Sequence, residues 1–357
     1  MRIHQITQTI SFGDAISNHI YEMDLRFQKW GYESHIFVQR PYPVKHHRLA
    51  SFDELGAFLD DPNDLFIFHY GVYHPGVELF QRAKGRKIVV YHNITPAHYY
   101  HHWDFFKENI CKIGRTYLSS LADCDLAIGV SDYNRQELIQ AGFTENKTAV
   151  LPIFLTLDTF ESLPINEHLA QKLSQLHKTN WLTVGRIAPH KGIHNVIRIF
   201  YIYHTYLNPE SHLYLVGSDS MANYKEALVK LIQELELSQH ITFTGKVSDA
   251  EFKTYYSSAD LYITASEHEG FCVPLIESMY FNLPILAKNS SAVPETLADA
   301  GILFSDLGYE EVASMAHLML TNSQLNQHIL SAQQKRLETF SPEHVESSLH
   351  EIIKQFE

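Results

Sequence analysis

Short apolar runs alternate with longer amphipathic segments along the whole chain. The runs lie at 3–6, 35–38, 65–69, 87–91, 126–130 and 149–151 in the first half, and at 181–184, 213–216, 241–244, 261–264, 284–287 and 302–304 in the second half. Runs of this length are typical of buried strands, and the segments between them are long enough to form helices. Strands that alternate with helices form parallel sheets covered on both faces. The pattern therefore predicts an α/β protein with two doubly wound, Rossmann-like domains of six strands each.

A break in this alternation follows residues 151–153, where Pro152 and Pro164 interrupt regular structure. We therefore predict a first domain at 1–157 and a second at 158–341. The final segment, 342–357, is predicted as a separate helix. Its apolar residues recur at helical spacing, at Val345, Leu349, Ile352 and Ile353.

The loops that follow the strands are the expected places for function. In open parallel sheets, ligands bind beyond the carboxyl ends of the strands. Two such domains that face each other would bind a substrate in the cleft between them. Fold alone does not fix activity, so the residues of these loops must indicate it.

The composition is that of an ordinary globular protein, with 45% hydrophobic and 19% charged residues. The formal net charge of −13 disfavours binding to nucleic acid and attraction to anionic membranes through bulk charge. Cys111, Cys124 and Cys272 are too far apart for a disulfide framework or a metal knuckle. No stretch approaches the ~20 apolar residues of a membrane span, and the chain opens on a predicted strand instead of a signal peptide. These features predict a cytoplasmic protein.

The stretch 266–279 combines a glycine turn with the start of a helix, directly after an apolar run. Pro274 suits the first turn of a helix, where the amide that it lacks would be unpaired. Free N–H groups at such a helix start can bind a phosphate. Glu269 and Glu277 bracket the turn, and carboxylates accept hydrogen bonds from sugar and ribose hydroxyls. The stretch thus predicts a diphosphate between a sugar and a ribose, although an ordinary structural turn fits it equally well.

A second loop, 185–192, follows the run 181–184 and precedes a predicted helix at 193–203. A diphosphate needs fixed cations when no metal serves it. Arg186 can bind two oxygens through its planar guanidinium, while Lys191 acts as a compact charge. The glycines at both ends of the loop allow a close approach of the backbone. A pair of ordinary surface cations is the alternative.

Together, the two loops resemble retaining glycosyltransferases of family 4, which have the GT-B fold. The resemblance lies in Glu-x7-Glu with Gly-Phe-x-x-Pro-Leu-x-Glu at 269–277, and in Gly-Arg-x4-Lys-Gly at 185–192. It is rich in motifs over 180–310 and mainly architectural over 1–150. The resemblance implies two Rossmann-like domains that face each other across a cleft, with the last helix crossing back to the first domain.

The resemblance also implies a role for each residue of these loops. Arg186 and Lys191 would be catalytic and stabilise the leaving diphosphate. Glu269 would be catalytic and bind hydroxyls of the donor sugar, and Glu277 would bind the ribose. The further donor-binding residues are Gly185, Gly270, Phe271, Cys272 and Val273 beside the phosphates, and Gly217, Lys246 and Val247 beside the nucleoside, where the backbone of Val247 would contact the base. For Cys272 we expect packing instead of redox chemistry.

The first domain offers fewer signals. Gly13 and Asp14 lie in a predicted strand-to-helix turn, and we expect them to contact the transferred sugar or the acceptor, although a plain turn fits equally. His92, at the carboxyl end of the strand 87–91, resembles the family's cleft histidine, which contacts the donor sugar, and is predicted to be catalytic. His69, at the end of the strand 65–69, is a second candidate of this kind.

The segment 96–106 is dense in aromatic residues and histidines. Aromatic faces stack on sugar rings, so this segment is predicted either as a wall or lid on the acceptor side or as a buried helix start. Lys107, Lys112 and Arg115 on the following helix would allow a weak peripheral contact with a membrane or a lipid-linked acceptor, without anchoring the protein.

We predict no metal site and no cofactor beyond the nucleotide sugar, which is a co-substrate. Asp123-Cys124-Asp125 matches the D-x-D motif by which other glycosyltransferases bind a metal. However, it precedes the strand 126–130, so its carboxylates should lie at the edge of the sheet opposite to the one that binds ligands. The pairs His46-His47 and His101-His102 lack the helical spacing and flanking ligands of a zinc site.

These expectations define one predicted reaction. The protein would move a hexose from a nucleotide diphosphate sugar, UDP-glucose or a related UDP-hexose by family frequency, to a hydroxyl of a glycan or lipid-linked acceptor. The transfer would retain the anomeric configuration, use no metal and serve polysaccharide biosynthesis, at the inner face of the membrane. The resemblance favours attack from the face of the leaving group, with a donor phosphate oxygen taking the acceptor's proton.

Other functions stay open at this point. They are a GT-B sugar phosphorylase, a nucleotide-sugar epimerase and a non-catalytic nucleotide-sugar-binding subunit. A Rossmann dehydrogenase is disfavoured because no G-x-G-x-x-G follows the first strand of either domain. The sequence makes no prediction of the oligomeric state.

Overall fold

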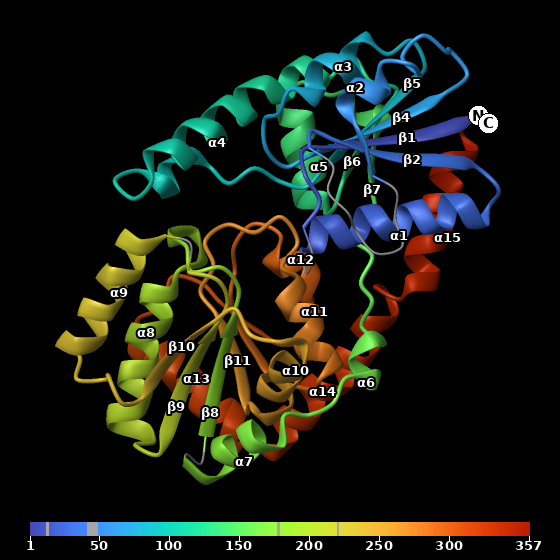
Figure 1. Cartoon of the computed structure of the whole chain (residues 1–357). Coiled ribbons are helices and arrows are strands. Elements are labelled where there is room, and N and C mark those ends of the chain that lie inside the picture. Colours follow the sequence, from blue (N-terminus) through green and yellow to red (C-terminus); the bar gives the residue numbers. More distant parts are fainter. Residues whose placement is uncertain (12–13, 41–48, 177–178, 220) are drawn as a thin grey trace. The chain divides into compact units, whose positions relative to one another are not determined.

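A computed structural model describes residues 1–11, 14–40, 49–176, 179–219 and 221–357 (Figure 1). The chain divides into two units: unit 1 comprises Met1–His98, Phe105–Leu155 and Thr339–Glu357, and unit 2 comprises Tyr99–Asp104 and Thr156–Glu338. The short segment Tyr99–Asp104 interrupts unit 1 in the sequence, a feature that the predicted division at residue 157 does not contain.

Unit 1 contains a parallel sheet of seven strands among the described residues. Their order across the sheet is β3 (Leu49–Ser51), β2 (Glu33–Val38), β1 (Arg2–Thr7), β4 (Leu65–Tyr70), β5 (Arg86–Tyr91), β6 (Leu126–Gly129) and β7 (Thr148–Val150). The sequence predicted six strands and missed β3. This edge strand has only three residues, Leu-Ala-Ser, and therefore forms no apolar run.

Helices lie on both faces of this sheet (Figure 1). They are α1 (Ala15–Lys29), α2 (Phe52–Leu55), α3 (Gly76–Arg82), α4 (Phe105–Leu118), α5 (Asp132–Gln140) and α15 (Pro342–Lys354). The start of α1 is set by Asp14, whose carboxylate accepts hydrogen bonds from the backbone N–H and the hydroxyl of Ser17 at 3.0 and 2.9 Å.

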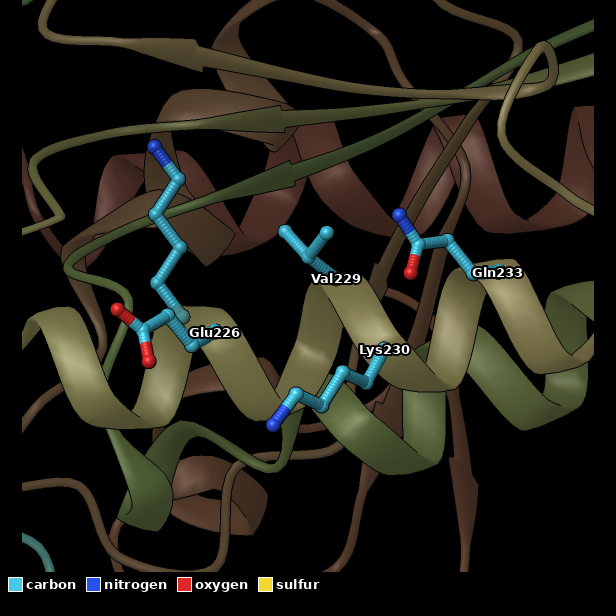
Figure 2. A pocket seen from close by; sticks show the side chains of 5 residues that line it. Glu226, Val229, Lys230 and Gln233 are labelled. Atoms are coloured by element: carbon cyan, nitrogen blue, oxygen red, sulfur yellow. The ribbon is translucent and has the colours of Figure 1, made fainter.

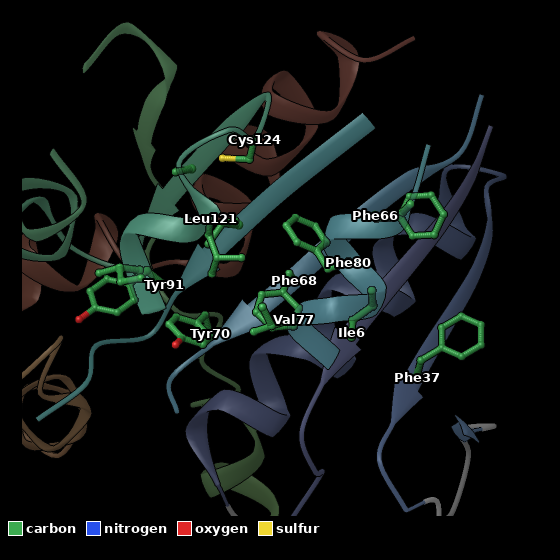
Figure 3. Packing of buried hydrophobic residues seen from close by; sticks show 14 of the residues in the cluster. Ile6, Phe37, Phe66, Phe68, Tyr70, Val77, Phe80, Tyr91, Leu121 and Cys124 are labelled. Carbon is green, nitrogen blue, oxygen red and sulfur yellow. The ribbon is translucent and has the colours of Figure 1, made fainter. Parts of the chain in front are cut away.

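The core of unit 1 is built from the strands and α3. All six residues of β4 are buried, which is why this strand forms a continuous apolar run instead of an alternating one. Figure 3 shows Phe68 of β4 near Val77 and Phe80 of α3. The rings of Phe68 and Phe80 stack with their centroids 5.0 Å apart.

The last helix, α15, packs against α1 within unit 1. Its residues Val345, Leu349 and Ile353 are fully buried. At the edge of this contact, Glu346 accepts from Lys29 at 2.9 Å and lies 3.3 Å from the guanidinium of Arg26. The end of the chain therefore contributes to the core of the unit that contains its beginning.

Unit 2 contains a parallel sheet of six strands among the described residues. Their order is β10 (Ile241–Gly245), β9 (Ser211–Val216), β8 (Thr179–Val184), β11 (Leu261–Thr264), β12 (Ile285–Lys288) and β13 (Ile302–Phe304). Every predicted apolar run of the second half corresponds to one of these strands. The prediction of two parallel, Rossmann-like sheets is confirmed.

Two layers of helices cover the sheet of unit 2, with α8 against α13 and α11 against α14. The helices are α6 (Thr159–Ser162), α7 (Glu167–Leu176), α8 (Ile193–Ile202), α9 (Ala222–Glu234), α10 (Asp249–Ser258), α11 (Val273–Tyr280), α12 (Val293–Leu297), α13 (Tyr309–Thr321) and α14 (Ser323–Glu338). After α8, the backbone continues into a π-helical turn at Tyr203–Leu207.

The strand order reverses direction between β1 and β4 in unit 1, and between β8 and β11 in unit 2. Ligands of open parallel sheets bind at such a switch point. In unit 2, the loops that follow β8 and β11 are the two loops in which the sequence predicts the chemistry.

Replacing Ile353 by alanine should destabilise unit 1 by ~2–4 kcal/mol, because the substitution leaves a cavity under a fully buried side chain. Urea unfolding measures this loss through the fluorescence of Trp30, whose ring lies 4.5 Å from that of His350 on α15. Glu351→Ala, at an exposed position of the same helix, is the control. Equal unfolding midpoints for the two variants would contradict the packing of α15 in unit 1.

Candidate functional site

The loops that follow β8 and β11 are held together by their backbones. Gly192 has a φ of +62°, and a Cβ there would lie only 2.0 Å from the carbonyl oxygen of Ala265. Glycine is therefore the residue that fits this position. Beside it, the N–H of Glu267 donates to the carbonyl of His190 at 2.8 Å.

This packing places Lys191 directly beside Glu269. The Nζ of Lys191 lies 2.7 and 2.8 Å from the two carboxylate oxygens. The hydroxyl of Ser266 donates to the same carboxylate at 2.6 Å, and the backbone N–H of Glu269 donates to the hydroxyl of Ser291 at 2.7 Å. Glu269 is only 8% exposed. A buried charge needs a partner and hydrogen bonds, and the carboxylate of Glu269 has both. Sequence reasoning assigned these residues to different parts of a ligand and missed their contact.

Arg186, in contrast, has an exposed side chain. It makes no hydrogen bond or ion pair with any residue in the described part of the chain. Its loop is fixed by the backbone, since the neighbouring Ile187 N–H donates to the carbonyl of Ser218 at 2.9 Å. The guanidinium is therefore available to an anion, whereas the ammonium of Lys191 is already neutralised.

The predicted nucleoside loops lie next to the Arg186 loop. Gly185 donates to the carbonyl of Val216, and Gly217 donates to that of Gly245, at 2.9 and 3.1 Å. A Cβ on Gly217 would lie 2.0 Å from the Gly185 carbonyl oxygen. The structure thus brings Gly185 and Gly217 together. Beyond Gly245, the side chain of Lys246 is exposed and Val247 packs against the core of unit 2.

The helix α11 begins as the sequence predicts. Cys272 is its N-cap residue, with a φ of +72°, and Pro274 occupies the first turn. Gly270, Phe271 and Val273 therefore lie at the amino end of this helix, beside Glu269. Burial raises the pKa of the Cys272 thiol well above its usual value, which agrees with the expected packing role.

Glu277 lies one turn into α11. The hydroxyl of Tyr256 donates to its Oε2 at 2.7 Å. Burial raises the pKa of the Glu277 carboxyl to about 7, and the Tyr256 hydrogen bond opposes this shift. The carboxyl is thus poised between its charged and neutral forms near neutral pH.

The aromatic segment Tyr99–Asp104 belongs to unit 2 and packs beside the same loops. The hydroxyl of Tyr99 donates to the carbonyl of Glu267 at 3.3 Å, and its ring lies 6.2 Å from that of His190. Trp103 contacts Tyr224 of α9 with a centroid distance of 5.1 Å. The aromatic side chains therefore line the neighbourhood of Lys191, and α4 begins only after this segment.

In unit 1, His92 is joined to His69, the second candidate histidine. Nε2 of His92 lies 3.0 Å from Nδ1 of His69, and Nε2 of His69 lies 2.9 Å from Oε1 of Gln5. Burial lowers the pKa of His92 to about 3, so the ring is neutral. Sequence reasoning missed Gln5. Its only signal is a polar residue inside the apolar run 3–6.

Several other predicted residues either lie outside the described part of the chain or make contacts that differ from the predicted ones. Gly13 and the pair His46-His47 lie outside the described residues. Asp14 serves as the cap of α1. Arg115 is not a free surface cation, as the sequence suggested, because it donates to the Ile94 carbonyl and to Glu137, each at 2.7 Å.

The D-x-D sequence lies at the amino end of β6, where the Asp125 carboxylate accepts from the backbone of Lys87 at 2.7 Å. In the described ranges, no three His, Cys, Asp or Glu residues are grouped so that they could hold a metal ion. None of the described helices combines the length and the apolarity that a membrane span requires.

A surface pocket of about 330 Å³ lies along α9 (Figure 2). It is lined by Lys225, Glu226, Val229, Lys230 and Gln233, which all belong to this one helix. None of the predicted site residues lines it, and we assign it no role.

Residues 165–336 match the family model described as glycosyl transferases group 1. This part of the chain, which lies within unit 2, is therefore similar to that family. Among its curated relatives are the O-antigen chain mannosyltransferase B of Escherichia coli, 24% identical over 241 residues, and the alpha-monoglucosyldiacylglycerol synthase of Streptococcus pneumoniae, 27% identical over 211 residues. These matches cover 65% and 57% of this chain, and they span 60% and 46% of the length of the relatives.

Solved structures with this architecture match the fold of this chain over nearly its whole length. The crystal structure of HepE from Anabaena in complex with UDP and glucose has a TM-score of 0.78 at 17% identity and covers 99% of this chain and 100% of its own. A structure from E. coli bound with UDP-2-fluoro glucose has a TM-score of 0.78 at 13% identity, with 99% of each chain covered. The predicted GT-B fold is confirmed.

The titration of Glu277 gives a testable consequence. Its pKa of about 7 in the folded protein exceeds the usual 4.5, so folding favours the protonated form. The stability of the protein should therefore fall as the pH rises between these two values. Glu277→Gln removes the titration but can still accept from Tyr256. We expect this variant to be ~3 kcal/mol more stable than wild type well above pH 7, with no difference below pH 4.5.

Urea unfolding across this pH range measures the difference. Glu351→Gln, at an exposed position, is the control and should follow the wild type at every pH. If Glu277→Gln also followed the wild type at every pH, the raised pKa would be refuted.

Proposed function

We propose that this protein is a retaining hexosyltransferase that uses a nucleotide diphosphate sugar, with UDP-glucose or a related UDP-hexose as donor. The observation that supports this most directly is the placement of Arg186, Lys191 and Glu269 on two adjacent loops at the switch point of unit 2. The match of residues 165–336 to the glycosyl transferases group 1 model supports glycosyl transfer, and solved structures of the same fold are complexes with UDP or UDP-glucose.

The cations of this site suit a leaving diphosphate. Arg186 is exposed and can bind two phosphate oxygens at once. Lys191 can bind a third while it keeps its contact with Glu269, because an ammonium has three donors. The charge on the diphosphate grows as the glycosidic bond breaks, so these contacts strengthen in the transition state and raise kcat. In this proposal, the two side chains take the place of a metal.

Glu269 would bind a hydroxyl of the donor sugar. Ser266 and Lys191 hold its carboxylate in one position. A held carboxylate accepts a hydrogen bond without a loss of side-chain freedom at binding. Lys191 would then connect the group that recognises the sugar to the phosphates that leave it.

Glu277 would bind the ribose. Two hydroxyl donors favour the ionised form of a carboxyl group, so a bound ribose would lower the raised pKa of Glu277. Gly217, Gly245 and the backbone of Val247 would lie along the nucleoside. Their loops already adjoin Gly185 through backbone hydrogen bonds.

The transfer itself would proceed from the face of the leaving group. The bond between the anomeric carbon and the phosphate oxygen breaks, and the acceptor oxygen forms the new bond on the same face. The phosphate oxygen of the leaving group takes the proton of the acceptor hydroxyl. This route requires no carboxylate nucleophile on the opposite face of the sugar.

The acceptor would be a glycan or a lipid-linked sugar in polysaccharide biosynthesis. The names of the relatives include O-antigen chain transferases and a diacylglycerol-linked synthase. On this chain, α4 exposes Phe105 and Phe106, at 82% and 72%, next to Lys107 in the sequence. Apolar rings beside a cation support a weak peripheral contact with lipid.

GDP-mannose is a second candidate donor, because relatives from Mycobacterium tuberculosis are named as GDP-mannose-dependent mannosyltransferases. A thermal-shift panel of UDP, GDP, ADP and their sugars separates these donors. A ligand at 100 times its Kd stabilises the folded protein by ~2.7 kcal/mol, which raises Tm measurably. We expect UDP and UDP-hexoses to give the largest shift.

A turnover assay then tests the reaction class. Release of free nucleotide only in the presence of an acceptor hydroxyl indicates transfer. Consumption of phosphate would instead indicate a phosphorylase, and an altered sugar without an acceptor would indicate an epimerase. A protein that no nucleotide sugar stabilises would contradict the whole assignment.

Arg186→Ala should lower kcat/KM by about 10²–10³-fold, equivalent to ~2–4 kcal/mol of transition-state stabilisation, without loss of fold stability. Lys191→Ala should show a similar loss of activity but should also destabilise the protein, because buried Glu269 then lacks its partner.

A double variant separates the two roles of Lys191. Adding Glu269→Gln to Lys191→Ala removes the unpaired charge, so stability should return while activity stays low. Steady-state kinetics and urea unfolding provide the two readouts. Near wild-type kcat/KM in both single variants would exclude this pair of cations from the reaction.

A further inference from the structure

The loop after β12 holds the backbone of Glu269 on both sides. The N–H of Glu269 donates to the hydroxyl of Ser291 at 2.7 Å, and its carbonyl accepts from the N–H of Ala292 at 3.3 Å. β12 lies beside β11 in the sheet, so the loops that follow these two strands are neighbours. All three residues belong to unit 2. A third loop thus supports the two loops that form the candidate site.

The contact between these loops continues on either side of this pair. The hydroxyl of Ser290 donates to the carbonyl of Ser266, and the hydroxyl of Thr296, on α12, donates to the carbonyl of Phe271 at 2.6 Å. Ser266 and Thr296 are each 1% exposed, and Phe271 is 5% exposed. In each of these hydrogen bonds, the loop after β11 contributes a backbone group. The segment after β12 therefore fixes the path of the backbone in the loop after β11.

Ser291 has a backbone conformation that is unfavourable for serine. Its φ is +45°, in the left-handed region, where a Cβ crowds the following carbonyl oxygen. Glycine adopts this conformation without such a cost, but it has no hydroxyl. A turn that only reversed the chain before α12 would need no side chain here. Strained residues persist where the surrounding structure holds them, often at functional sites. The hydroxyl that accepts from the N–H of Glu269 therefore explains why a serine occupies this position.

We propose that Ser291 is a positioning residue for the donor site, and that its hydroxyl fixes the peptide of Glu269 so that the carboxylate is in place before the transferred sugar binds. The role of Glu269 toward the sugar rests on the proposed function, whereas the contact with Ser291 does not. A residue that is held in advance loses less freedom when a ligand binds, which strengthens binding. The effect concerns the sugar and not the diphosphate, because Thr296 holds Phe271, at the turn predicted to contact the phosphates, separately.

Two variants of Ser291 separate the hydroxyl from the strain. Ser291→Ala removes the hydroxyl and keeps a Cβ in the left-handed region, whereas Ser291→Gly removes both the hydroxyl and the strain. We expect Ser291→Gly to have the higher Tm of the two variants. Both should bind the nucleotide sugar equally weakly, because binding follows the hydroxyl. If Ser291→Gly instead bound the nucleotide sugar as the wild type does, the hydroxyl would have no role and the proposal would be wrong.

Titration calorimetry on the full-length protein compares each nucleotide sugar with its free nucleotide. The probes are UDP-glucose against UDP, and GDP-mannose against GDP. For the pair that the wild type binds, both variants should raise the Kd of the nucleotide sugar about 5- to 30-fold and leave the Kd of the nucleotide within about 2-fold of its wild-type value. An equal loss of affinity for both ligands would show that Ser291 supports the loop as a whole, and would overturn the positioning role.

A double variant tests whether Ser291 acts through Glu269. Added to Glu269→Ala, the change Ser291→Gly should weaken binding of the nucleotide sugar no further, because the side chain that Ser291 positions is gone. An additive loss would contradict the proposal.

Glu236→Gly is the matched control for the release of strain. Glu236 is exposed and has a φ of +60° in the turn after α9. Glycine at this position should raise Tm, as it does for a strained turn in general, and should leave the Kd of the nucleotide sugar unchanged.

Hydrogen exchange tests the contact without any ligand. The hydrogen bond to Ser291 protects the N–H of Glu269, so this amide should exchange about 10-fold faster in Ser291→Gly. Mass spectrometry of peptides that contain Glu269 measures the rate. Unchanged exchange would refute the contact, even if Ser291→Ala could not be purified. Absence of nucleotide-sugar binding in the wild type would instead refute the proposed function, and with it the role in sugar binding, and would leave the exchange result intact.

Discussion

Gly192 has no Cβ, and this allows the close approach of the two loops that form the candidate site. The Ala265 carbonyl oxygen lies only 2.0 Å from the place where a Cβ would stand, so a larger residue would separate the loop after β8 from the loop after β11. Lys191 directly precedes this contact, and Glu269 follows Ala265 by one turn of the loop. The same contact therefore determines the 2.7 Å ion pair. It is possible because β8 and β11 are neighbours in the sheet although β9 and β10 lie between them in sequence.

The ion pair also determines how the site can receive an anion. A carboxylate beside a diphosphate would repel it, but Lys191 offsets the charge of Glu269. In the proposed function, Arg186, whose guanidinium is exposed, would then supply the positive charge that an incoming phosphate meets. Glu269 remains able to accept a hydrogen bond because Lys191 and Ser266 do not use all the lone pairs of its two oxygens. One loop pair thus offers both attraction to phosphate and an acceptor for a hydroxyl.

The sequence predicts the sheets well because parallel strands bury both faces and so appear as continuous apolar runs. β3 is not predicted because it is a short edge strand and forms no continuous apolar run. The loops after β8 and β11 are predictable because glycines and charges follow the strands directly. The contact between Lys191 and Glu269 is not, because the two residues are 78 positions apart and meet only through the strand order. Gln5 is missed for a related reason: one polar residue in an apolar run has no visible partner until β1 lies beside β4.

The two units place different kinds of polar groups at the ends of their strands. In unit 1, burial keeps the rings of His69 and His92 neutral, so the hydrogen bond between them involves no charged group. In unit 2, Arg186, Lys191 and Glu269 provide charge at the corresponding edge of a sheet with nearly the same strand order. A neutral acceptor discriminates among hydroxyls by geometry, whereas fixed cations attract any phosphate. Burial therefore keeps the polar groups of unit 1 uncharged, whereas the exposed guanidinium of Arg186 keeps a positive charge at the edge of the sheet in unit 2.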